Sequence, residues 1–287
     1  NGKLDLGLGA GINVVARGGF LSLNIGQDDP NSSDSDALGN TFNGNAGVAI
    51  RMDIGGGTVF DPNVLPIVAQ FNIVHNTIEN TAQRTEDLNG NGTLEMGEDR
   101  NRNAMIDVRG EGIEIIIDGT QTLLTNSLVA NNLIQNNGSH GVSFVRNDQA
   151  RIDFMTIRDN EILTNTEDGI SLFAQNGRDD ILNFEISGNL IDRNLLYGID
   201  IFAGADSFFE VNIINNMITQ NGLNGTGLSG GIRTDESRST GSIVSPFVSS
   251  DTPAISGSWL GNTISENIGP GIEIRGYTTV NIGDGTE

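Results

Sequence analysis

The chain has 287 residues, with 37 acidic side chains against 15 basic ones and a formal net charge of −22. Such a surface repels nucleic acids, anionic membranes and acidic polysaccharides, which argues against these partners. The sequence has no cysteine, which excludes a disulfide framework, and no apolar run of about 18 residues that would insert into a membrane.

In chain order, apolar residues alternate with polar ones in short runs separated by polar turns. Residues 1–25 carry such runs and predict the first coil of a repeating fold. A polar stretch at 28–36 indicates a surface loop, and the pattern restarts at Asn40. It stops after Asn80, resumes at Gly112 and stays regular as far as Asn221. Residues 237–256 are rich in Ser, Thr and Pro, which indicates a second surface loop.

One unit recurs along the chain. It consists of an Asn two residues before an apolar residue, a second polar residue five positions after that Asn, and a Gly that opens a strand. The first position is occupied by Asn40, Asn76, Asn132, Asn160, Asn189, Asn216 and Asn262. From Asn132 to Asn216 successive units begin 28, 29 and 27 residues apart. Repeats of this size indicate a solenoid, because no unit can bury its apolar face alone.

The alternation has the period of strands, and no helical period is sustained. We therefore predict an all-β parallel β-helix with three strands per coil and about 28 residues per coil. Stacked Asn side chains should form ladders at its corners, where Asn and Gly also tolerate positive φ. Residues 1–287 are predicted to form a single domain with an insertion at 82–111 and the surface loop at 237–256.

The Gly-Ile-x-Ile and Asn-x-Ile units resemble those of the right-handed parallel β-helix superfamily. This superfamily includes pectate lyases, polygalacturonases, alginate epimerases and many bacterial surface proteins. The resemblance covers nearly the whole chain and implies a right-handed coil and an extracellular or cell-surface location. It says little about activity, because function depends on a site rather than on a fold.

The insertion carries a twelve-residue calcium motif, Asp87 to Glu98, which resembles EF-hand and dockerin loops. Its expected ligands are Asp87, Asn89, Asn91, the Thr93 carbonyl and Glu98, with Glu95 as a further carboxylate. Gly92 stands where the loop turns sharply, and all the ligands are hard oxygens that suit Ca²⁺ rather than zinc. The alternative is an Asn/Gly-rich solvated turn.

A second, weaker set follows the first directly. Its oxygen donors are Asp99, Asn101, Asn103, the Met105 carbonyl and Asp107. Ala104 stands where the first motif has Gly, and no closing Glu is present. No amphipathic helices flank either set, which argues against a helix-opening sensor or a cohesin-binding module. A calcium site and a plain turn both remain open for this set.

Two fragments resemble pieces of enzyme motifs. Tyr197-Gly-Ile-Asp200 matches the start of the alginate epimerase motif, but Ile201-Phe202 replaces its Pro-His. Ser139-His140-Gly141 and Asp179-Asp180 resemble parts of the polygalacturonase set in the wrong order, without its Arg-x-Lys. These departures favour a structural, adhesive or carbohydrate-binding role. The alternative is a polysaccharide-active enzyme, a lyase, hydrolase or uronate epimerase, whose site lies on the Gly-Ile-x-Ile sheet.

The same sheet is expected to carry a ligand-binding face. If its strands alternate, a stripe of apolar side chains faces outward beside a polar row that includes Asp200. The stripe consists of Ile116, Val145, Phe173 and Phe202. Such a stripe is typical of a contact with sugar faces or with another surface protein. The alternative is that a loop covers it.

The ends of the solenoid lack obvious caps. Only polar residues follow Ile282, and Trp259 is expected to fill the wide final coil. An uncapped end exposes core and strand edge. We therefore expect either a continuation of the chain in a longer protein or end-to-end stacking.

Overall fold

The structure, a computed structural model, describes residues 3–4, 11–27, 39–56, 66–82, 84–85, 108–175, 181–204, 207–223, 229–236, 254–276 and 278–283. Both candidate calcium sets, at 87–107, lie outside the described residues. The same holds for residues 237–253 of the expected surface loop.

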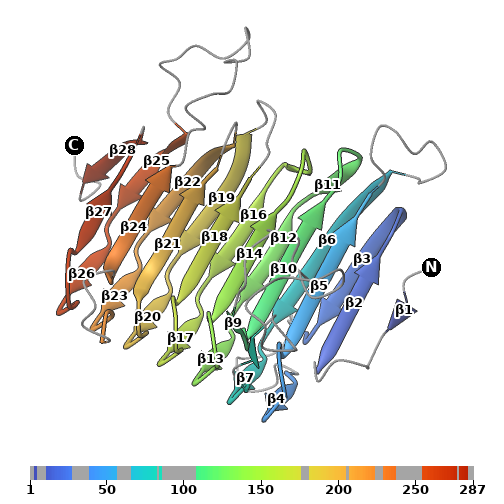
Figure 1. The fold of residues 1–287 in the computed structure, drawn as a ribbon, viewed down its shortest axis with the longest axis horizontal. Helices are drawn as coiled ribbons and strands as arrows, with labels where there is room; N and C mark the ends of the chain where they lie inside the picture. Colours follow the sequence, from blue (N-terminus) through green and yellow to red (C-terminus); the bar gives the residue numbers. More distant parts are fainter. Residues whose placement is uncertain are drawn as a thin grey trace, which may run out of the picture.

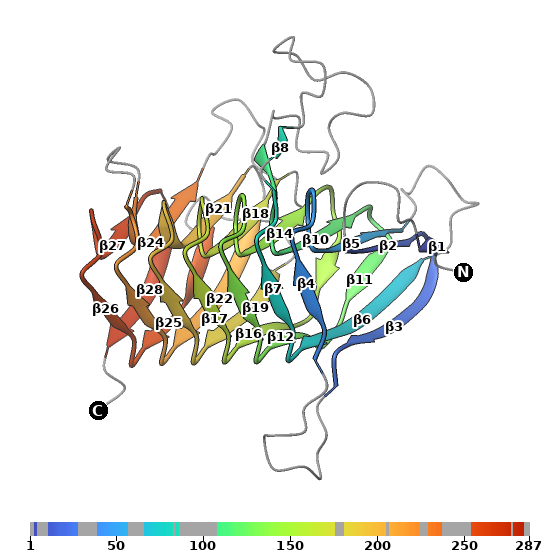
Figure 2. The same ribbon diagram turned by 90° about the horizontal axis from the view of Figure 1, so that it is seen from below.

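Strands make up all the regular structure of the described residues, and most of them lie in three sheets along the long axis of the molecule (Figure 1). The chain passes from sheet to sheet and returns one strand further along, as in a parallel β-solenoid (Figure 2). The predicted all-β solenoid is therefore confirmed. Within the described ranges, no helix is long and apolar enough to span a membrane.

Sheet A consists, in spatial order, of β1 (Lys3–Leu4), β2 (Ile12–Ala16), β5 (Ile50–Gly55), β10 (Ile113–Asp118), β14 (Val142–Arg146), β18 (Ile170–Ala174), β21 (Tyr197–Ala203), β24 (Gly230–Glu236) and β27 (Ile272–Ile274). Sheet C consists of β4 (Thr41–Asn43), β7 (Thr77–Glu79), β13 (Leu133–Gln135), β17 (Glu161–Leu163), β20 (Leu190–Asp192), β23 (Met217–Thr219) and β26 (Thr263–Ser265).

Sheet B consists of β15 (Arg151–Ile152), β11 (Thr122–Leu124), β6 (Ile67–Val74), β12 (Ser127–Ala130), β16 (Met155–Arg158), β19 (Ile181–Ser187), β22 (Phe208–Ile214), β25 (Ile255–Leu260) and β28 (Thr278–Gly283), and β3 (Gly19–Ile25) pairs with β6. Because β25 already begins at Ile255, the last two residues of the loop expected at 237–256 belong to a strand. Pairing in the three sheets is parallel, except that β1 runs antiparallel to β2.

Alternation along each strand sends every second side chain into one continuous core. The Phe144 and Phe184 rings meet edge to face, with their centroids 5.0 Å apart, and Phe209 lies 5.9 Å beyond Phe184. Trp259 is also buried, and its Nε1 donates a hydrogen bond to the Val211 carbonyl at 3.2 Å. Trp259 therefore lies in the core on β25, with β28 as the last strand of the sheet beyond it.

Asparagine ladders mark the two corners that flank sheet C. At the first corner, side-chain amides bond from coil to coil at 2.9–3.0 Å along Asn40, Asn76, Asn132, Asn160, Asn189, Asn216 and Asn262. At the second corner, the series Asn137, Asn165, Asn194, Asn221 and Asn267 bonds at the same distances. The residue before a rung has positive φ, as at Asn131 (55°) and Asn136 (54°). The predicted ladders are therefore confirmed.

The glycine that opens a sheet A strand is required by close approach. A Cβ on Gly141 would lie 2.5 Å from Cγ2 of Ile162 and 2.7 Å from the carbonyl oxygen of Gly169. A Cβ on Gly169 or on Gly198 would meet the equivalent isoleucine and glycine atoms of the coil that follows it. The chain turns from sheet C into sheet A so tightly that no side chain fits.

The insertion leaves the solenoid at this same corner. The Thr81 hydroxyl donates to the Gly110 carbonyl, which joins residues on the two sides of the insertion. Beyond this contact, β8 (Arg84–Thr85) and β9 (Val108–Arg109) pair antiparallel. Figure 2 shows β8 standing off from the three sheets. The two ends of the insertion are therefore held together at its base.

Candidate functional site

The outward face of sheet A has the strongest functional features in the described residues. Its strands pair in register, so equivalent side chains form rows along the solenoid axis. One row contains Ile116, Val145, Phe173, Phe202 and Asp235, and the adjacent row contains Glu114, Ser143, Ser171, Asp200 and Arg233.

Two phenylalanines form a stacked pair in the first row. The Phe173 and Phe202 rings lie almost parallel, at 7°, with their centroids 5.0 Å apart. Both side chains are partly exposed. This spacing follows from the distance of about 4.8 Å between neighbouring strands. Because the rings stack on each other, their facing sides are covered, and the partly exposed remainder of the pair, the aromatic platform, is a short apolar patch on two adjacent coils.

The expected apolar stripe is shorter than four residues. Ile116 is 1% exposed and Val145 is 4% exposed, although neither belongs to the interior core. Each lies in the outward row with a neighbour of the same row on both sides. The prediction that Ile116 and Val145 offer contact surface is therefore wrong, and the accessible part of the stripe is Phe173 and Phe202.

An ion pair lies beside the rings. Arg233 donates two hydrogen bonds to the Asp200 carboxylate, that from Nε at 2.7 Å. Its guanidinium also lies over the Tyr197 ring, 4.5 Å from the centroid. Burial, and then the charge of Asp168, raise the pKa of Asp200 to about 6 despite the opposing effect of Arg233. Asp200, expected as a ligand-binding residue, is thus buried and bound within the chain.

A histidine is held between two carboxylates at the corner that leads into sheet A. His140 Nε2 lies 3.1 Å from Glu167, and its Nδ1 lies 3.3 Å from Asp168. Burial alone would lower the pKa of His140, but the two carboxylates outweigh it and raise the pKa to about 10. The raised pKa favours the imidazolium at neutral pH, and the Asp168 backbone N–H also points at His140 Nδ1, at 3.2 Å, so both ring nitrogens have partners within the chain.

A tyrosine completes the cluster. The Tyr197 hydroxyl donates to Glu273 at 2.9 Å, and its backbone N–H donates to Asp168 at 2.8 Å. Burial, followed by the hydrogen bond to Glu273, raises the pKa of Tyr197 to about 12. The acid and base groups of this corner are thus already paired with one another.

The stacking of coils brings together fragments that are separate in the sequence. His140, Asp168 and Tyr197 each precede the glycine that opens a sheet A strand, so they lie in one row. Sequence reasoning singled out His140, Tyr197 and Asp200 but missed Glu167, Asp168 and Arg233. When the repeats are aligned on Gly141, Gly169 and Gly198, Asp168 takes the same position as His140 and Tyr197. This alignment is the sequence signal that could have identified Asp168.

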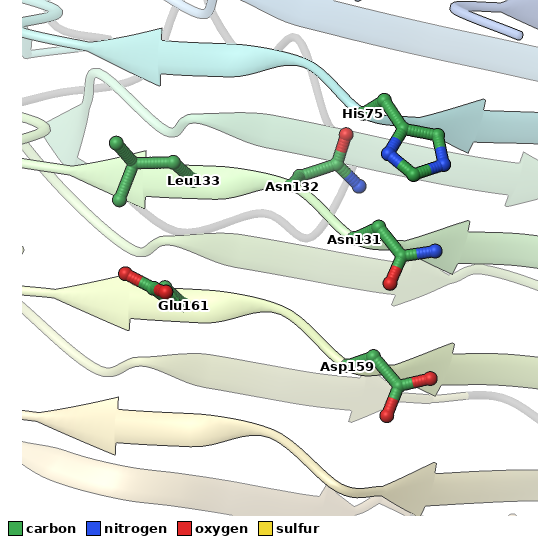
Figure 3. A pocket seen from close by; sticks show the side chains of 6 residues that line it. All are labelled: His75, Asn131, Asn132, Leu133, Asp159 and Glu161. Carbon is green, nitrogen blue, oxygen red and sulfur yellow. The ribbon is translucent and has the colours of Figure 1, made fainter. Parts of the chain in front are cut away.

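A shallow pocket of about 460 Å³ lies at the corner between sheets B and C. It is lined by His75, Asn131, Asn132, Leu133, Asp159 and Glu161. Figure 3 shows that His75, Asn131 and Asp159 follow one another along the corner. Asp159 is paired with Arg158 at 2.6 Å. His75 lies at the corner between sheets B and C, whereas His140 lies at the corner between sheets C and A.

None of the expected calcium ligands lies among the described residues. In the described ranges, no group of three or more His, Cys, Asp or Glu side chains is placed to hold a metal ion. No protein-family model, curated protein or solved structure matches the chain. The fold and the surface chemistry of sheet A are therefore the basis for a functional proposal.

Proposed function

We propose that this protein is a secreted or cell-surface β-solenoid that binds a polysaccharide along the outward face of sheet A, in a structural or adhesive role. The stacked pair Phe173 and Phe202 is the observation that supports this function most directly. Sugar rings pack their apolar faces on aromatic side chains. A polymer laid along the axis would place successive units over successive coils.

The surrounding side chains suit such a ligand. Ser171 is partly exposed beside the rings, and the Asp200–Arg233 pair holds the neighbouring strands in fixed positions. Hydroxyl and charged groups next to an aromatic platform supply the hydrogen bonds that orient a sugar. Because the pairs already exist within the chain, little ordering entropy is lost on binding.

The proposal includes a right-handed coil of about 28 residues, in keeping with the superfamily that the repeat resembles. It also includes a calcium ion held by the motif from Asp87 to Glu98. The support for calcium is the all-oxygen donor set and the joined base of the insertion, where Thr85 pairs with Val108. The ion would order the insertion, whose acidic residues otherwise repel one another on a protein of net charge −22.

The binding test is a titration of the protein with neutral, amino-sugar and uronate polysaccharides. Replacing both Phe173 and Phe202 with Ala should weaken the best ligand about tenfold or more, because each aromatic contact contributes about 0.5–1.5 kcal/mol. Phe20→Ala is the matched control, since Phe20 is 73% exposed on the separate sheet B. Equal affinity of the double variant and the native protein, with an unchanged circular dichroism spectrum, would exclude this site.

A polysaccharide-active enzyme is the second candidate. The observation in its favour is that His140, Asp168, Tyr197 and Asp200, from three successive coils, come together where the chain enters sheet A. Such an enzyme would have to break the internal pairs when substrate binds. Incubation with uronate polymers and neutral glycans, followed by assays for new reducing ends, unsaturated products and epimerised units, tests this function. Turnover that Asp200→Asn abolishes would favour the enzyme over the binding module.

A further inference from the structure

We propose that the sheet A face selects a polysaccharide that carries amino groups, such as a glucosamine polymer, over neutral and acidic polymers. This inference rests on the proposed binding function and adds the charge of its ligand. It follows from the charged side chains that lie in the rows of the two phenylalanine rings and at the corner that leads into sheet A.

Carboxylates outnumber cations among the charged groups on this part of sheet A and at the corner that leads into it. The carboxylates are Glu167, Asp168, Asp200, Asp235 and Glu273, and the cations are Arg233, Arg275 and the protonated His140. The face therefore keeps a net negative charge after its internal ion pairs have formed. The whole chain adds to this field, because it carries a net charge of −22 and Lys3 is its single lysine.

Some of these carboxylates are within reach of a ligand. The side chains of Asp235, Glu167 and Glu273 are 30%, 24% and 22% exposed. Asp235 pairs with Phe202 in the register of β21 and β24, so its carboxylate lies in the same row as the rings. Its ion pair with Arg275 is loose, at 3.7 Å. A sugar stacked on Phe202 would bring a substituent next to this carboxylate.

An amine fits this position better than other substituents. A protonated amine donates charge-assisted hydrogen bonds to carboxylates and can also lie over an aromatic face. A hydroxyl or acetamide group gains neither of these charge effects. A uronate would bring a like charge to a face whose net charge is already negative, which is repulsive. Charge complementarity thus favours the amino-sugar polymer.

The test compares three oligosaccharides of equal length by calorimetric titration at pH 6: a glucosamine oligomer, its N-acetylated form and a uronate oligomer. We expect the glucosamine oligomer to bind about tenfold more tightly than the acetylated one at low salt, from several exposed charge contacts. The difference should shrink severalfold near 1 M salt, where the Debye length is about 3 Å.

Two carboxylate variants separate a local effect from the overall charge. Asp235→Asn should reduce the preference for the amine severalfold. Asp192→Asn, which removes the same charge from sheet C, should leave the preference unchanged. An equal effect of the two variants would overturn the local site in favour of the general field of the protein.

The remaining outcomes distinguish this inference from the function on which it rests. Equal binding of the amine and acetylated oligomers at low salt, or tightest binding of the uronate, would overturn the charge selection. In either case the Phe173 and Phe202 double variant still reports whether the platform binds glycans. If none of the three oligomers binds, both the inference and the polysaccharide-binding function fail.

Discussion

At the residue scale, His140 links its coil to the next through two charged contacts. Its raised pKa, about 10 against an ordinary 6.5, means that the folded protein binds this proton more tightly than the unfolded chain. The resulting stabilisation is fully present below pH 6.5 and is lost as the pH rises toward 10. Glu111, Glu167 and Asp168 are the carboxylates responsible.

We therefore expect His140→Gln to lower the free energy of unfolding by about 2 kcal/mol at pH 6, and by clearly less at pH 10. Urea unfolding at the two pH values measures both effects. Arg158→Gln is the control, because Arg158 forms an exposed pair with Asp159 and should cost little at either pH. An effect of His140→Gln that does not change with pH would contradict the charged state of this histidine.

Asn165 tests the ladder. Its side chain is buried, its Oδ1 accepts from the backbone and amide nitrogens of Asn137 at 3.1 and 2.9 Å, and its Nδ2 donates to Asn194 at 2.9 Å. Asn165→Ala removes the hydrogen-bond partner of these buried groups of Asn137 and Asn194. We therefore expect the free energy of unfolding, measured by heat or urea, to fall by about 2–4 kcal/mol. Asn43→Ala, at an exposed asparagine that bonds to Glu79, should cost well under 1 kcal/mol. Similar costs at the two sites would show that ladder position does not matter.

At the element scale, the described part of the insertion is its base, where the Thr81 hydroxyl donates to the Gly110 carbonyl and β8 pairs with β9. We expect calcium to act on this element alone. Chelation should raise protease cleavage between Thr85 and Asp107 and leave the melting temperature of the coils nearly unchanged. If binding were coupled to global folding, a hundredfold excess over Kd would instead add about 2.7 kcal/mol.

The matched variant for this element is Asp87→Ala combined with Glu98→Gln, which removes two expected carboxylate ligands. It should be cleaved in calcium as readily as the native protein is cleaved in chelator. Magnesium serves as the ion control, because it prefers a smaller octahedral site. If cleavage is the same with calcium, magnesium and chelator, the motif is an ordinary turn and not a calcium site.

At the scale of the whole molecule, the C-terminal coil presents three strand edges. β26, β27 and β28 are the last strands of their sheets, and Ile268, Ile274 and Ile282 are 48%, 44% and 52% exposed. At the other end of sheet A, β1 covers the edge of β2 in the antiparallel direction. The C-terminal coil therefore presents an apolar edge to which another copy of the chain can pair.

We expect this chain to self-associate through that coil as its concentration rises. Ile274→Asp with Ile282→Asp should shift the equilibrium to monomer, because each places a charge on the apolar edge. Light scattering over a range of concentrations measures the change, and Leu223→Asp, at a residue 49% exposed outside that coil, is the control. A native chain that stays monomeric throughout would contradict end-to-end stacking.

The sequence by itself determined the solenoid, the corners and the ladders. Each repeat carries the same local signals, and Asn132, Asn160 and Asn189 could be aligned by counting residues. Strand alternation and turn residues act over a few neighbours, so a single chain displays them in full. Because the same signals recur in every repeat, equivalent residues could be matched from coil to coil, and their stacking was therefore predictable as well.

The tertiary structure decided which surface positions meet and which are covered. The Asp200–Arg233 pair and the carboxylates around His140 join residues of different coils, so they depend on register and on rotamers that no local pattern specifies. Ile116 and Val145 hold outward positions yet are buried, whereas Phe173 and Phe202 are partly exposed. Alternation determines the direction of a side chain, but exposure depends on its neighbours in three dimensions.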